Sequence, residues 1–138
     1  MARILGIDYG TKKTGIATTD SLQIICSGLD TIPTNNLFEF LDIYIQQEDV
    51  ERIVVGMPLH EDGKPAQIAH LVVGFIRKIK KIYPHIPVVE WDERGSSNAA
   101  KQVILQSGAK QKKRRDKQLV DKIAAALILQ DYMENNVW

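Results

Sequence analysis

Four acidic residues have the types and positions expected of a metal site. Asp8 ends one apolar run, and the neighbours Asp92 and Glu93 end another. Asp121 lies within a segment that is otherwise apolar. Functional side chains of a mixed α/β sheet collect at the carboxyl ends of its strands, so we expect these acids to meet at one edge. Clustered carboxylates are suitable ligands for Mg²⁺ or Mn²⁺, which prefer oxygen donors.

Such a cluster predicts a two-metal-ion nuclease. Two ions about 4 Å apart can activate a water, orient the scissile phosphate and stabilise the leaving oxygen, and Asp8 is the expected bridging ligand. Successive residues of a strand face opposite ways, so Asp92 and Glu93 are not both expected to face Asp8. We favour Glu93 and keep Asp92 as the alternative. Either acid could instead serve only as a helix-entry charge.

Asp121 is the acid expected from the last helix. Ala124 and Ala125 follow it by one helical turn and are small, so this side of the helix can press close to a sheet. That approach would bring the Asp121 carboxylate to the strand ends. Asp131 lies ten residues further on, which corresponds to roughly 15 Å along a helix, too far to join the same site.

Basic residues accompany these acids. Lys12 and Lys13 follow the first acid, and Arg94 follows the pair. A denser cluster, from position 110 to position 117, has six basic residues and one acid. Phosphate neutralisation releases condensed counterions and drives nucleic-acid binding, although solvated surface charge is the alternative. The residues predicted to bind nucleic acid are Lys12, Lys13, Arg94, Lys112, Lys113, Arg114 and Arg115.

Other chemistries are poorly supported by the motifs. Gly10 and Gly15 have the spacing that begins a P-loop, but Ile16 and Ala17 occupy the positions of its Lys and Ser/Thr. The three histidines do not have zinc-binding spacing. The first motif would also fit an actin-like or Hsp70-like ATPase. Those enzymes clamp their nucleotide between two lobes, and 138 residues leave room for one.

The elements that must position the acids follow from hydrophobic patterning and turn residues. Five strands are predicted, at 3–9, 14–19, 22–32, 52–56 and 87–91. Four helices are predicted: one after Pro33 with Asn36 as its cap, one after Pro65, and two more at 98–106 and 116–134. The inner stripe of the second helix is predicted to consist of Ile68, Leu71, Val72, Phe75, Ile76, Ile79 and Ile82.

Three meander strands followed by alternating helices and strands predict an α/β protein. The expected architecture is a mixed five-stranded sheet with helices on both faces. The order β-β-β-α-β-α-β-α is that of the ribonuclease H-like fold, in one domain spanning residues 1–138. Actin-like ATPase domains share this core, so the fold alone does not choose between the two functions.

Composition is consistent with a cytoplasmic protein. Hydrophobic residues make up 44% and charged residues 25% of the chain, as in ordinary globular domains. No apolar run approaches the roughly 20 residues needed to span a bilayer, and we see no secretory signal. A single cysteine, Cys26, excludes an internal disulfide and fits a reducing compartment.

Four sequence blocks, taken together, resemble a known family. In chain order they are GIDYGTKKTGIA at 6–17, IVVGMP at 53–58, WDER at 91–94 and DKIAAALILQ at 121–130. Each block alone is weak, but together they are specific and span nearly the whole chain. The sequence is similar to the YqgF family, also called RuvX, of bacterial ribonuclease H-like nucleases.

The resemblance implies a hydrolase that acts on phosphodiester bonds and matures the 5′ end of pre-16S ribosomal RNA. The family's motif acids fall on Asp8, the pair Asp92 and Glu93, and Asp121, the same set reached from geometry. Expected partners are structured RNA and the pre-30S ribosomal particle, with no membrane. The alternatives are a Holliday junction resolvase acting on branched DNA and a non-catalytic RNA-binding assembly factor. Nothing in the sequence indicates the oligomeric state.

Overall fold

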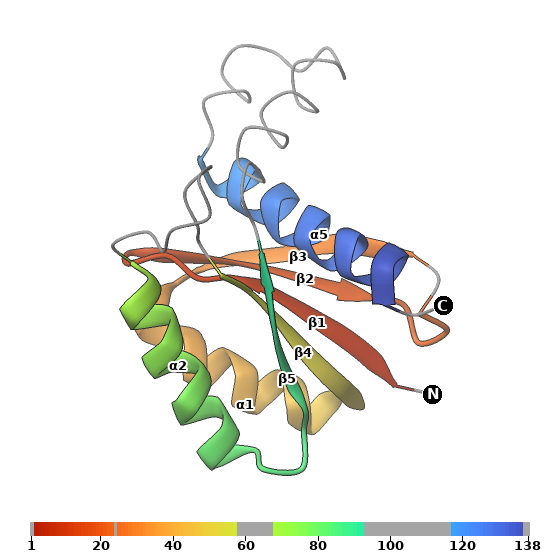
Figure 1. Ribbon diagram of the computed structural model, residues 1–138, viewed down its shortest axis with the longest axis horizontal. Coiled ribbons are helices and arrows are strands. Elements are labelled where there is room, and N and C mark those ends of the chain that lie inside the picture. Colours follow the sequence, from red (N-terminus) through yellow and green to blue (C-terminus); the bar gives the residue numbers. More distant parts are fainter. Residues whose placement is uncertain (1, 24, 58–67, 93–116, 137–138) are drawn as a thin grey trace.

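A computed structural model describes residues 2–23, 25–57, 68–92 and 117–136 (Figure 1). The strands are β1 (Arg3–Asp8), β2 (Lys13–Thr19), β3 (Cys26–Pro33), β4 (Val50–Met57) and β5 (Val88–Asp92). The helices are a 3₁₀ turn (Thr34–Asn36), α1 (Leu37–Gln47), α2 (Ala69–Ile82) and α5 (Lys117–Asn136). The five predicted strands are confirmed. The helix predicted at 98–106 lies outside the described residues. No described helix is long and apolar enough to cross a membrane.

The strands form one mixed sheet in the order β3-β2-β1-β4-β5. β2 pairs antiparallel with β1 and β3, whereas β4 pairs parallel with β1 and β5. Ile7 lies opposite Val55, and Met57 lies opposite Asp92. The carboxyl ends of β1, β4 and β5 therefore share one edge, and β4 lies between the strands that end in Asp8 and Asp92. The fold class predicted from the sequence is confirmed.

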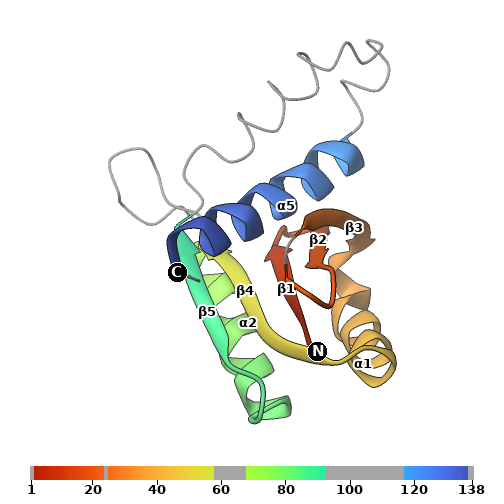
Figure 2. The ribbon, with the colours of Figure 1, turned by 90° about the vertical axis from the view of Figure 1, so that its right-hand side faces the viewer.

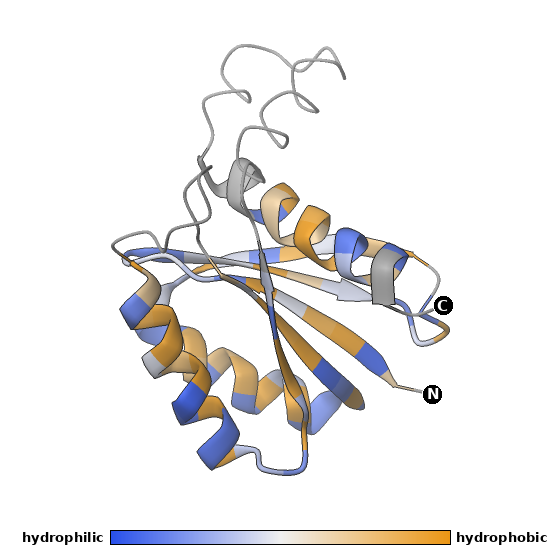
Figure 3. Ribbon diagram, viewed as in Figure 1, coloured by the Kyte–Doolittle hydropathy of each residue, from blue (hydrophilic) through white to orange (hydrophobic). Residues whose placement is uncertain are grey.

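Helices cover both faces of the sheet, as expected. α1 and α2 lie on one face and α5 crosses the other (Figures 1 and 2). Alternation along β1 divides its side chains between the two layers, with Leu5 and Ile7 in the α1/α2 core and Ile4 in the α5 core. Hydrophobic residues accordingly gather along β1 and β4 (Figure 3).

The third strand begins at Cys26, so the prediction that it starts at position 22 is wrong. Asp20 causes the difference, because its carboxylate accepts a hydrogen bond from the Ile25 amide at 2.9 Å. The Asp20 amide also donates to the Ile25 carbonyl, and Gln23 has a φ of 58°. A turn closed in this way takes up the backbone groups that a longer strand would need.

Two helix predictions are confirmed only in part. Asn36 is the N-cap residue of α1, as predicted, but it also ends the 3₁₀ turn and its side chain makes no capping hydrogen bond. On α2, Leu71 and Ile82 are 40% and 45% exposed rather than buried. The buried stripe is centred near Phe75 and Ile79, and these two residues fall at its margin at 100° per residue.

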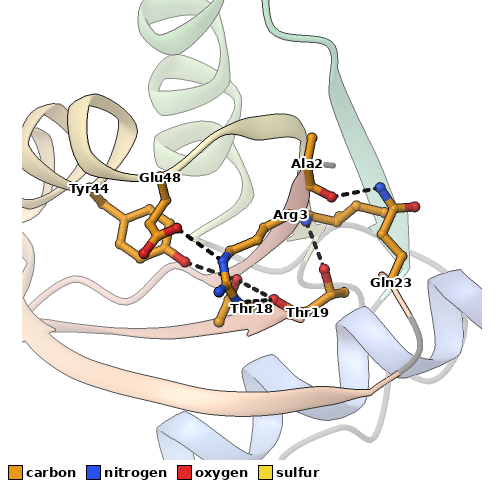
Figure 4. A network of polar contacts seen from close by, with 8 residues as sticks. Ala2, Arg3, Thr18, Thr19, Gln23, Tyr44 and Glu48 are labelled. Atoms are coloured by element: carbon orange, nitrogen blue, oxygen red, sulfur yellow. Dashed lines mark hydrogen bonds and ion pairs between the residues drawn. The ribbon is translucent and has the colours of Figure 1, made fainter. Parts of the chain in front are cut away.

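The amino end of the sheet, remote from Asp8, is held by a polar network around Arg3 (Figure 4). The Arg3 guanidinium donates to the Glu48 carboxylate at 3.2 Å and to the Thr19 carbonyl at 2.9 Å. Thr18 bonds the Tyr44 hydroxyl at 3.1 Å and so connects β2 to α1. These contacts stabilise the sheet and leave its opposite edge to the candidate site.

Tyr83, after α2, predicts a loss of stability at alkaline pH. The Tyr83 residue is buried, and its partly buried hydroxyl donates to Asp42. Desolvation by burial is the larger cause and the hydrogen bond to Asp42 the next, and together they raise the pKa of Tyr83 to about 12. An unfolded tyrosine titrates near pH 10. The folded state therefore retains a proton that the unfolded state loses, so this stabilisation is complete below pH 10 and falls as pH rises toward 12.

The measurement is urea unfolding of wild type and Tyr83→Phe between pH 8 and pH 12. The variant should be less stable by about 1 kcal/mol at pH 8. Its stability should also decline less steeply above pH 10. Parallel declines in the two proteins would contradict this assignment.

Candidate active site

Asp8 is half-buried at the end of β1, on the wall of a cleft of about 410 Å³. The 9–12 loop, which joins β1 to β2, forms most of this cleft. Ile68, directly before α2, closes another side. The lining residues are Asp8, Tyr9, Gly10, Thr11, Lys12, Lys13 and Ile68.

The loop approaches its own chain so closely that Gly10 cannot carry a side chain. A Cβ atom built there would lie 2.2 Å from the Lys13 carbonyl oxygen, well inside van der Waals contact. Backbone atoms cannot move aside as a flexible side chain can. Gly10 is therefore required by close approach within the loop that places Lys12 and Lys13 beside Asp8.

Aromatic packing connects the same loop to the helical layer. The rings of Tyr9 and Phe75 have centroids 5.0 Å apart, and Phe75 is 5.4 Å from Phe38 on α1. Such tilted pairs stabilise beyond their buried area. The ring contact with Phe75 thus anchors Tyr9, the first residue after Asp8, to α2.

Lys12 and Lys13 are exposed at the cleft, where the sequence predicted phosphate contacts. Both lysines line the same cleft as Asp8. A negatively charged backbone entering the cleft would meet two cations next to an acid. This arrangement is suited to a metal-assisted reaction on a phosphate ester.

α5 presses on the sheet as predicted from its small residues. A Cβ at Gly6 would lie 2.9 Å from the Leu129 Cβ and 3.2 Å from the Ala125 carbonyl oxygen. At β3, a Cβ on Gly28 would lie 3.0 Å from the Lys122 Cβ. The helix backbone therefore crosses β3 and β1 at contact distance, and Ala125 is fully buried.

The predicted ligands are described to different extents. The structure places the side chain of Asp8, and only the backbone of Asp92, at the end of β5, and of Asp121, in α5. Among described side chains, no three of His, Cys, Asp or Glu form a group that could hold a metal ion. The predicted residues outside the described ranges are Glu93, Arg94, Lys112, Lys113, Arg114 and Arg115.

Asp131 has a structural contact at a different place. Its carboxylate accepts a hydrogen bond from the Trp91 indole at 2.6 Å. The Trp91 ring also packs edge-on against Tyr132, with centroids 5.6 Å apart. These contacts place Trp91 on the α5 face of the sheet, near the end of β5.

A second hollow, of about 490 Å³, lies between the turn before β3 and the end of α5. Burial is the largest cause that raises the pKa of the Cys26 thiol there, so the reactive thiolate is disfavoured. This hollow lacks the lysines and the strand-end acid of the Asp8 cleft. Its lining residues are Leu22, Gln23, Ile25, Cys26, Gln130, Met133 and Glu134.

Sequence reasoning missed the residues that support the loop. Thr14 is fully buried, and its hydroxyl lies 2.9 Å from the hydroxyl of Thr34. The available signal was a threonine inside a strand otherwise rich in small and apolar residues. Its partner, Thr34, is 20 residues away, so spacing alone could not indicate the pair.

Comparisons with known proteins agree with the fold and with the family resemblance. The family described as "RuvX: Holliday junction resolvase" matches residues 2–135. The chain belongs to the RuvX family. It is thus a member of a nuclease family.

Relatives of this RuvX chain match along nearly their whole length. A Flavobacterium johnsoniae protein named "Putative pre-16S rRNA nuclease" is 46% identical over 135 residues, which are 98% of each chain. A Bacteroides fragilis protein of the same name is 45% identical over 134 residues, 97% of each chain. These names describe the relatives.

Among solved structures, the RuvX chain is similar to Thermus thermophilus RuvC in complex with a Holliday junction substrate. The TM-score is 0.57 at 18% identity, covering 99% of this chain and 97% of RuvC. A second T. thermophilus RuvC structure gives a TM-score of 0.53 at 15% identity, covering 96% and 95%. At these identities the similarity shows a common fold, the ribonuclease H-like one.

Proposed function

We propose that this chain is a metal-dependent nuclease that processes the 5′ end of pre-16S rRNA. The observation that carries the proposal is the position of Asp8, at the carboxyl end of β1 in a cleft shared with Lys12 and Lys13. The names of the curated relatives support RNA as the substrate. Residues 1–138 would act as one nuclease domain, in the cytoplasm where ribosomes are assembled.

Asp121 is proposed as a metal ligand together with Asp8. Both are close along the chain to the contact between Gly6 and Ala125. Asp8 is two strand residues beyond Gly6, about 6.6 Å, and Asp121 is one helical turn before Ala125, about 6 Å. Carboxylates on these two elements fit the oxygen-rich donor set of Mg²⁺ or Mn²⁺.

Glu93 is the preferred third acid, with Asp92 as the alternative. Trp91 packs against Tyr132 on the α5 face. Side chains alternate between the two faces along a strand. Glu93, two positions after Trp91, is therefore the acid expected on the face that α5 covers. Asp8 belongs to this face too, because it follows Gly6 by two residues.

Each residue then has a separate task. When bound, two divalent ions supply an activated water and Lewis-acid stabilisation of the phosphate. Asp8 would hold the ions at the carboxyl end of β1. Lys12 and Lys13 would hold the phosphate backbone at the cleft, and Arg94 with the basic residues at 112–115 would bind more of the substrate.

Removing the two cleft lysines should weaken RNA binding and reduce its salt dependence. For Lys12→Ala/Lys13→Ala, the magnitude of the negative slope of log affinity against log salt should fall by about 1.4, or about 0.7 for each lost phosphate contact on a single strand. Fluorescence anisotropy with a labelled RNA across a salt series measures this slope. The matched control is Lys80→Ala/Lys81→Ala, which removes the same charge from the last turn of α2. Equal slopes in the two double variants would contradict the assigned contacts.

The substrate is tested by offering wild type a pre-16S leader RNA and a four-way DNA junction in parallel. Each is incubated with Mg²⁺, with Mn²⁺ or with EDTA, and the products are mapped. Metal-dependent cleavage of the RNA supports the proposal. Cleavage of the junction in its place would favour the resolvase alternative. Tight RNA binding without cleavage would favour a non-catalytic assembly factor.

A further inference from the structure

We propose that Thr14 and Thr34 form a positioning pair that holds the 9–12 loop in its phosphate-binding conformation. The inference deepens the proposed function and rests on it, because it concerns the loop that carries Lys12. Neither threonine lines the cleft. Both would act through the loop backbone and not on the substrate.

A closed ring of hydrogen bonds connects Gly10, Thr14 and Thr34. The Thr34 hydroxyl donates to the Gly10 carbonyl at 2.7 Å. The Gly10 amide donates to the Thr14 hydroxyl oxygen at 3.5 Å, and the two hydroxyl oxygens lie 2.9 Å apart. Both backbone groups of Gly10 are therefore bound to this one pair of side chains.

The direction of every bond in this ring follows from proton counting. A threonine hydroxyl has one proton, and that of Thr34 is already donated to the Gly10 carbonyl. The Thr14 hydroxyl must therefore donate to Thr34, while it accepts from the Gly10 amide. Since Thr14 is fully buried, an unmade bond here would leave a desolvated hydroxyl, which is costly. The ring is satisfied only when the loop has the observed conformation.

A second hydrogen bond from Thr34 restrains the backbone at Lys12. The Thr34 amide donates to the Lys12 carbonyl at 2.9 Å. Thr34, in the 3₁₀ turn that follows β3, thus forms hydrogen bonds to the loop backbone at Gly10 and at Lys12, on either side of Thr11. Tyr9 fixes the other end of the loop against Phe75.

Fixing the loop before binding should improve the affinity for phosphate. Ordering a flexible loop and its long side chains on binding costs free energy, and pre-ordering removes that cost. The threonine ring therefore affects substrate binding through Lys12 and Lys13. It does not supply a reacting group, so KM should change much more than kcat.

The test is Thr34→Val, which keeps the shape of the side chain and removes its hydroxyl. We expect KM, and the dissociation constant for a fluorescein-labelled RNA hairpin with an unpaired 5′ tail, to rise roughly tenfold. Thr34→Ser should restore most of the affinity. Hydrogen exchange at the Gly10 amide should become faster in Thr34→Val.

The matched control is Thr18→Val. Thr18 is buried like Thr14 and hydrogen-bonded through its hydroxyl like Thr34, but its partner is Tyr44, at the far end of β2. It should lower the melting temperature to a similar degree and leave KM and RNA affinity unchanged. An effect of Thr34→Val on affinity no larger than that of Thr18→Val would overturn the proposal.

A double-mutant cycle separates positioning from general destabilisation. In a Lys12→Ala/Lys13→Ala background, Thr34→Val should have little further effect on affinity, because the groups it positions are absent. Full additivity would refute the pair's role.

Binding and hydrogen exchange do not require cleavage. A wild type that binds RNA without cutting it would thus reject the nuclease function, while the threonine pair would still be judged by these two readouts.

Discussion

Asp8→Asn should reduce cleavage of the pre-16S leader RNA by about a thousandfold, or roughly 4 kcal/mol of transition-state stabilisation. The amide keeps the size of the side chain but lacks the negative charge that a bridging metal ligand supplies. We also expect the increase in melting temperature caused by Mn²⁺ in wild type to be much smaller in the variant. Single-turnover cleavage and thermal melting with and without Mn²⁺ measure the two effects.

Asp30→Asn is the matched control for this substitution. Asp30 is an exposed acid on β3 whose carboxylate accepts a hydrogen bond from the Thr31 amide. An asparagine oxygen can accept the same bond, so activity and the Mn²⁺ effect should both be retained. If Asp8→Asn kept more than about a tenth of wild-type activity, Asp8 could not be the bridging ligand.

Gly6→Ala should lower the free energy of unfolding by about 2 kcal/mol, although it adds one methyl group. The new Cβ would lie 2.9 Å from the Leu129 Cβ and 3.2 Å from the Ala125 carbonyl oxygen. The Leu129 side chain and the α5 backbone at Ala125 would therefore have to move away from β1. Since Asp121 is on the same helix, RNA cleavage should fall by more than the loss of folded protein accounts for. Urea denaturation and single-turnover assays on folded protein measure the two effects.

Gly74→Ala provides the opposite control. A Cβ at Gly74, on the exposed side of α2, meets no atom within 4 Å. Alanine there should stabilise the helix by about 0.5–1 kcal/mol and leave cleavage unchanged. If Gly6→Ala were neutral while Gly74→Ala stabilised the protein, the close contact between α5 and β1 would be wrong.

The sheet could be predicted because each strand has a local signature. Arg3–Asp8 and Val50–Met57 are short apolar runs ended by turn residues, and such runs are typical of buried strands. The less accurate boundaries depend on side-chain contacts that patterning does not show. The start of β3, for example, is set by the carboxylate of Asp20.

The candidate site could be predicted to the level of residue types and strand ends. Asp8 and Asp92 follow from apolar runs that stop at an acid, and the structure places these strand ends at one edge. The assignment of Asp121, and the choice between Glu93 and Asp92, remain predictions. No local signal indicated the threonine ring, because it joins Thr14 and Thr34 across 20 residues.

The sequence by itself determined the order of the elements, the acids that end them and the family to which the chain belongs. These properties are local, since apolar periodicity, turn residues and short motifs are each complete within a few positions. Only the tertiary structure decided how the Asp8 cleft is built. α5 crosses closely over Gly6, and Thr34 forms two hydrogen bonds to the backbone of the 9–12 loop. Both features depend on contacts between segments that are distant in the chain. Such contacts depend on the pairing register of the whole sheet, which no single segment specifies.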